Sequence, residues 1–150
     1  MKQVRDIRAA NITLDEFRGN GAARLREGLR GVEDALSSAR VLTHREDPLQ
    51  GRDEILKQAN DDVSKALTRI RNATTRLKQS RFTQAADWDG AFDVEEEALL
   101  EAFQRGFDAA TADELQKSMD DAQAVFARME QGFERKVEQQ VKRLMATRPG

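Results

Sequence analysis

A run of apolar residues between positions 52 and 82 constrains the fold of this chain more than any other feature. Its spacings alternate between three and four residues, and a large side chain alternates with alanine: Leu56, Ala59, Val63, Ala66, Ile70, Ala73 and Leu77. A heptad pattern of this kind places every member on one face of an α-helix, which is buried against another helix. Alanine at every second position permits close helix approach. The pattern predicts a helix over 52–82 with antiparallel, coiled-coil-like packing.

A second seam of the same kind predicts a long helix over 112–146. Its members are spaced by four and three residues in turn: Leu115, Met119, Ala122, Phe126, Met129 and Phe133. At 1.5 Å per residue such a helix is about 50 Å long. The two seams alone therefore predict an elongated molecule.

The remaining segments complete a single all-α domain. Residues 1–12 form a polar lead-in, 13–42 a helix and 93–110 an acidic helix, and no stretch alternates as a strand does. The sequence Thr111-Ala112-Asp113-Glu114 has the capping-box pattern that starts a helix. We therefore predict an elongated up-down bundle of four or five helices, whose principal hairpin pairs 52–82 with the helices of 93–146. Whether its seams face inward or toward another chain is left open.

The residue types present in the chain argue against catalysis and against metal binding. The chain has no cysteine and one histidine, so neither a thiolate metal site nor a histidine cluster can form. Pairs of carboxylates such as Asp61-Asp62 fall on polar helix faces, where acid–base catalysis has no desolvated group to use. The sequence predicts no catalytic residue, no metal site and no cofactor, and so a protein that is not an enzyme.

Charge is unevenly distributed along the chain. Residues 1–82 contain 17 basic and 12 acidic side chains, whereas residues 83–132 contain 3 basic and 13 acidic ones. Neutralisation of one half by the other is the favoured interpretation. The alternative is an exposed acidic surface that masks a basic partner, as a stoichiometric inhibitor or chaperone would. Its candidate residues are Glu95, Glu96, Glu97, Glu101, Asp120 and Asp121.

A basic cluster follows the first seam, between Arg69 and Arg81. Phosphate binding needs such a stripe open to solvent. In the heptad frame Arg69 and Arg76 lie beside the seam, where they can pair with acids of the helix that begins at Asp93. Nucleic-acid binding through Arg69–Arg81 is therefore a disfavoured alternative.

The only tryptophan lies in the tripeptide Trp88-Asp89-Gly90, between two long predicted helices. This resembles the Trp-x-Gly turn of WXG100-type proteins, which are exported helical hairpins. The resemblance implies secretion, but the chain has no tyrosine for the export signal of those families and has an additional helix in front. We do not assign the family, and we expect Trp88 to anchor the turn on the bundle.

The function that best fits this sequence is non-enzymatic protein–protein interaction or assembly. Partners are other proteins or copies of the chain itself, so a homo-oligomer is one expectation, and a subunit of a larger particle such as a phage or secretion assembly is another. No apolar run is long enough for a membrane span, and none follows the amino terminus as a signal peptide would. We expect a location in the cytoplasm or in a particle assembled there.

Overall fold

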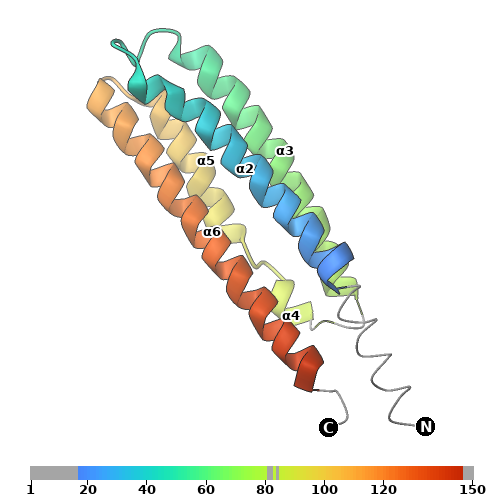
Figure 1. The fold of residues 1–150 in the computed structure, drawn as a ribbon. Helices are drawn as coiled ribbons and strands as arrows, with labels where there is room; N and C mark the ends of the chain where they lie inside the picture. The colour runs from blue at the N-terminus through green and yellow to red at the C-terminus, as the bar shows by residue number, and fades with distance from the viewer. Residues whose placement is uncertain (1–16, 81–82, 84, 147–150) are drawn as a thin grey trace, which may run out of the picture.

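The computed structural model describes residues 17–80, 83 and 85–146 of the chain. Four helices run alternately up and down in an elongated bundle, and the described residues contain no strand (Figure 1). They are α2 (Ala23–Arg40), α3 (Arg52–Gln79), α5 (Asp93–Asp108) and α6 (Ala112–Ala146). The predicted all-α, up-down bundle with antiparallel packing is confirmed. No helix in the described part of the chain has the length and apolarity needed to cross a membrane.

Three short helical elements flank or join these four. The π-helical turn η1 (Phe17–Ala22) leads into α2, and the 3-10 turn η2 (Val41–His44) follows it. One turn of helix, α4 (Ala85–Trp88), lies where the sequence predicts only a connection. The predicted lead-in over 1–12 and the first residues of the predicted helix 13–42 lie outside the described residues.

The two closely packed hairpins are α2 with α3 and α5 with α6. The prediction that 52–82 pairs chiefly with the helices of 93–146 is therefore wrong. The reason is a pair of glycines on α2. A Cβ on Gly28 would lie 2.6 Å from Cγ1 of Ile70, and one on Gly31 would lie 3.0 Å from Cβ of Ala66. The alanines of α3 and the glycines of α2 together allow the closest approach in the bundle.

The hairpins then pack side by side, with α2 against α6 and α3 against α5. Each of α2 and α5 thus has the same two neighbours, and the two occupy opposite corners of the bundle. α5 is 16 residues long and α3 is 28, so α5 covers only part of the length of α3. The short helix α4 lies at the end that α5 leaves open, beside α3 (Figure 1).

The turn between α5 and α6 follows the predicted capping box. The Thr111 hydroxyl oxygen accepts a hydrogen bond of 3.1 Å from the Glu114 amide. The Glu114 carboxylate reaches back to the Ala110 amide at 2.9 Å, one residue before the position that a regular capping box would use. α6 accordingly begins at Ala112.

Candidate interaction surfaces

Both heptad seams face the interior of a single chain. All thirteen predicted seam residues are 3% exposed or less, including the seven on α3 and the six on α6. They belong to one continuous apolar core that also contains Trp88, Phe92 and Phe103. Apolar surface already buried within a monomer cannot also form a contact between molecules. Interaction must therefore use the outer faces of the bundle.

The predicted acidic surface divides into exposed and inward-facing members. Glu97, Glu101 and Asp120 are exposed, whereas Glu95 is half-buried. Asp121, also half-buried, pairs with Arg105 across the α5–α6 hairpin at 3.4 Å. Only part of the predicted set is therefore free to meet a partner.

Glu96 is not a surface residue, in contrast to the prediction. Its side chain is 7% exposed, and its Oε2 atom lies 3.0 Å from Nε of Arg71 on α3. Burial raises the pKa of Glu96 above its ordinary value of 4.5, and the hydrogen bond from Arg71 partly opposes this rise. Glu96 faces α3 because it stands on the inner side of α5, three residues before the buried Leu99. It joins the two hairpins.

An acidic face nevertheless remains on the outer side of α5. We define it by Glu97, Glu101 and Asp108, which are exposed and form no ion pair with any described residue. Their spacing of four and seven residues places them on one side of the helix. Val94, seven residues before Glu101, is 76% exposed, and Leu100 is 36% exposed. The acidic face therefore includes two uncovered apolar side chains.

A second charged face covers the opposite corner of the bundle. Six exposed arginines on η1, α2 and α3 form no ion pair with a described residue. We call five of them, all but Arg40 at the end of α2, the arginine face: Arg18, Arg24, Arg30, Arg69 and Arg76. The α2 arginines were not predicted. The signal was available, because residues 18–30 contain four arginines and a single acid, Glu27.

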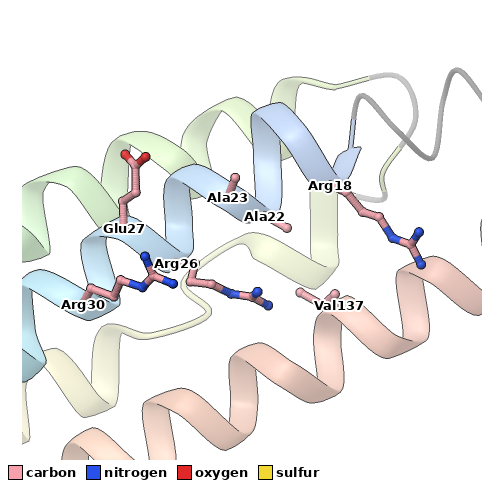
Figure 2. A pocket seen from close by; sticks show the side chains of 7 residues that line it. All are labelled: Arg18, Ala22, Ala23, Arg26, Glu27, Arg30 and Val137. Carbon is pink, nitrogen blue, oxygen red and sulfur yellow. The ribbon is translucent and has the colours of Figure 1, made fainter.

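Two shallow depressions flank α2 within the arginine face. The first, of about 220 Å³ between α2 and α3, is lined by Arg24, Arg69 and Arg76 together with Asn72, Ala73 and Glu27. The second, of about 360 Å³, lies toward α6; its lining residues are drawn in Figure 2. Among the residues that the structure describes, Glu27 is the only carboxylate that lines either depression.

The depression between α2 and α6 combines arginines with an apolar floor. Figure 2 shows Arg18 of η1 and Arg26 of α2 extending toward α6, with Val137 between them, whereas Glu27 points away. Arg26 is already engaged, because it lies 3.6 Å from a carboxylate oxygen of Glu134 and 5.5 Å from the centre of the Phe133 ring. Arg18 and Arg30 have no such partner among the described residues, and they border an apolar surface that is open to solvent.

The basic cluster predicted at 69–81 is split by the fold. Arg71 and Lys78, a heptad apart, face the second hairpin and pair with Glu96 and with Asp89, the latter at 3.1 Å. Arg69 and Arg76, also a heptad apart, lie on the other flank of the seam, beside α2. The prediction that Arg69 and Arg76 pair with the acidic helix is therefore wrong, and the pairing falls to their neighbours. Arg81 lies outside the described residues.

Trp88 is buried at the junction of the two hairpins, with 1% exposure. Its ring centre lies 6.4 Å from that of Phe17 in a tilted arrangement. Its Nε1 atom has no hydrogen-bond partner among the described residues. Asp87 next to it accepts hydrogen bonds from Lys136 and Arg143 of α6. The Trp88 turn therefore links the two hairpins, whereas the turn of a WXG100-type protein joins the two arms of one hairpin.

The described residues contain no group of three or more metal-ligating side chains placed to hold an ion, and His44 is exposed. Comparisons of the chain with protein-family models, with curated proteins and with solved structures give no match. The two charged faces are therefore the candidate functional features of the described chain.

Proposed function

We propose that this protein is a non-enzymatic assembly or adaptor protein, which binds protein partners through the outer faces of a self-contained helical bundle. One observation supports the proposal above the others. The seam residues are buried in the core, while part of the exposed charge that forms no ion pair within the described chain lies on two faces of opposite sign. Unpaired charge of this kind directs association and partner choice more than it stabilises a monomer.

The proposal includes a location in the cytoplasm or in a particle assembled there. A subunit of a larger particle would use two faces at once, one toward each neighbour. An inhibitor or chaperone would use the acidic face alone and would bind a basic partner. The two forms of the proposal differ in which face a partner needs.

The test is affinity capture with matched variants. Purified protein is immobilised and exposed to a lysate of the source organism, and bound proteins are cross-linked and mapped to residues. One variant reverses the arginine face (Arg24→Glu with Arg30→Glu), and another reverses the acidic face (Glu97→Lys with Glu101→Lys). Two control variants carry the same changes of charge elsewhere on the surface. One is Arg128→Glu with Arg135→Glu, and the other is Asp61→Lys with Glu130→Lys. These four residues are exposed and form no ion pair with a described residue.

The proposal would be supported by a partner that binds the wild type and both controls and that cross-links to one of the faces. The variant in which that face is reversed must also lose this partner. Loss with the arginine-face variant alone or with the acidic-face variant alone assigns the face. A set of bound proteins that neither face variant changes would contradict it.

Nucleic-acid binding is the second candidate, because Arg69 and Arg76 are exposed and form no ion pair with a described carboxylate. Phosphate groups would be drawn to all five residues of the arginine face. Against it stand the net charge of −2 and the apolar floor beside Arg18 and Arg30, since protein–DNA interfaces are polar and strongly basic. Salt-dependent binding of a DNA or RNA duplex, lost in the arginine-face variant only, would favour this candidate.

A further inference from the structure

The arginine face and the acidic face point away from each other. α2 and α5 each contact both α3 and α6, which places them at opposite corners of the bundle. Most of the arginine face surrounds α2, and the acidic face covers the outer side of α5. A molecule with complementary charges on opposite sides can bind a copy of itself front to back.

The two faces also match in length. Arg18 and Arg30 are twelve residues apart and Val94 and Asp108 are fourteen apart, which corresponds to about 18 Å and about 21 Å of helix. Each face combines its charges with apolar surface. Val94 and Leu100 are uncovered on the acidic side, and Ala22, Ala23 and Val137 line the depression on the basic side. Contact between the faces would bury apolar atoms as well as pair charges.

We propose that the arginine face of one copy binds the acidic face of a second copy. This inference rests on the proposed function and names the partner as the chain itself. The interface is heterologous, because the two surfaces in contact differ, so a bound pair still offers one free arginine face and one free acidic face. Association of this kind continues into rows or rings of molecules.

A second copy of the chain could bind either face, whereas an external polyanion could bind only the arginine face. A nucleic acid would engage the arginines and leave Glu97, Glu101 and Asp108 unpaired at the far side of the molecule. It would also be repelled by the acidic second hairpin, since residues 83–132 carry thirteen acids and three bases. The observations therefore favour the protein partner that carries the complementary face.

The experiment measures absolute mass by light scattering across protein concentration. Wild-type protein at low salt is expected to exceed 16.9 kDa, with a mass that grows with concentration. At about 1 M salt, where the Debye length is about 3 Å, the mass is expected to fall toward that of the monomer. Both face variants are expected to associate at least about tenfold more weakly than wild type, because each places like charges opposite one another.

The decisive step mixes the two face variants in equal amounts. The arginine-face variant keeps its acidic face and the acidic-face variant keeps its arginine face, so the mixture is expected to regain mass that neither variant reaches alone. The charge-matched controls at Arg128 and Arg135 or at Asp61 and Glu130 are expected to associate as wild type does. Thermal unfolding followed by circular dichroism verifies that every variant is folded.

Several outcomes would overturn the inference. The inference would be contradicted by a wild type that is monomeric at every concentration at low salt. It would also be contradicted if both face variants associate as the wild type does, or if mixing them does not restore association. If that monomer captures a foreign protein through one face, the proposed function stands and only self-association fails. If it captures nothing, both fail. A monomer that binds duplex DNA through the arginine face would replace the second copy with nucleic acid.

Discussion

The two hairpins reach the same up-down topology through different packing. No aromatic side chain is buried in α2 or α3, and their closest contact runs between Gly28 or Gly31 and the opposing Ala66 and Ile70. α5 and α6 bury large and flexible side chains instead: Phe103, Phe126, Phe133, Met119 and Met129. The helices of the first hairpin are so close at these glycines that a larger side chain there would collide with α3 and lower the stability of the fold. In the second hairpin the truncation of a large side chain would leave a cavity, although Gly106 of α5 is also close to α6, where a Cβ would lie 3.1 Å from Oγ of Ser118.

The hairpins differ in charge as well as in packing. Contacts between them use Arg26, Arg71 and Lys78 of the first hairpin with Glu134, Glu96 and Asp89 of the second part of the chain. The charge asymmetry visible in the sequence is thus partly used to join the hairpins. The arginine face and the acidic face are the part of the remaining charge that the proposed function uses.

The largest expected effect comes from a charge placed in the tight hairpin. Ile70 is fully buried opposite Gly28, so Ile70→Asp puts a carboxylate where neither water nor a partner can reach it. We expect a loss of more than about 5 kcal/mol, enough to unfold a domain of ordinary stability. Circular dichroism and urea unfolding measure it, with Thr75→Asp on the exposed side of α3 as control. Wild-type helicity and melting temperature in the Ile70 variant would contradict the assignment of this seam.

The next effect tests how much the burial of Trp88 at the junction of the two hairpins stabilises the fold. Trp88 fills their junction, so Trp88→Ala is expected to cost about 3–5 kcal/mol. Trp88→Phe keeps most of the apolar body and loses no hydrogen bond formed within the described residues, so its cost should be clearly smaller. Urea unfolding by circular dichroism gives both values. Equal losses in the two variants would mean that the indole N–H has an essential partner.

Replacing one glycine of each hairpin by alanine is expected to change the free energy of unfolding in opposite directions. A Cβ at position 28 would lie 2.6 Å from Ile70 Cγ1 and 3.2 Å from its backbone nitrogen, so Gly28→Ala should destabilise by about 1–3 kcal/mol. A Cβ at position 132 of α6 would have no atom within 4 Å, so Gly132→Ala should stabilise by about 0.5–1 kcal/mol through helix propensity alone. Equilibrium unfolding of both variants measures the difference. Stabilisation by both would show that α2 and α3 are not as close as the fold requires.

Heptad spacing predicted two of the four helices closely, because it depends on local periodicity. The seam over 112–146 gives the bounds of α6, and the seam over 52–82 gives α3 to within a few residues. Spacing states that a face is buried but not which helix covers it. The partner of α3 was therefore predicted wrongly, although Gly28 and Gly31 on α2 were the signal for the closer contact.

The charged residues were harder to place for the same reason. Positions 69 and 76 and positions 71 and 78 flank the α3 seam on opposite sides, and only the arrangement of the other helices decides which flank meets acids. Glu96 was predicted to lie on the acidic surface, and the structure places it in the interior. Its neighbours Glu95 and Glu97 are more exposed, and one helical step of about 100° turns it inward toward Arg71.

The smallest effect concerns this contact between the hairpins. Burial raises the pKa of Glu96, so the folded protein holds this proton more tightly than the unfolded chain does, and the ionised form costs stability at neutral pH. The contribution of Glu96 is most favourable below its unfolded value near 4.5 and is lost as pH rises through the folded value. Glu96→Gln should thus be more stable than wild type at pH 7, by on the order of 1 kcal/mol or less, with the difference closing toward pH 4.5. Urea unfolding between these pH values measures it, with Glu97→Gln as the exposed control. A variant that is less stable than wild type at pH 7 would show that the ion pair with Arg71 outweighs desolvation, and that charge attraction joins the hairpins more strongly than burial of this carboxylate opposes them.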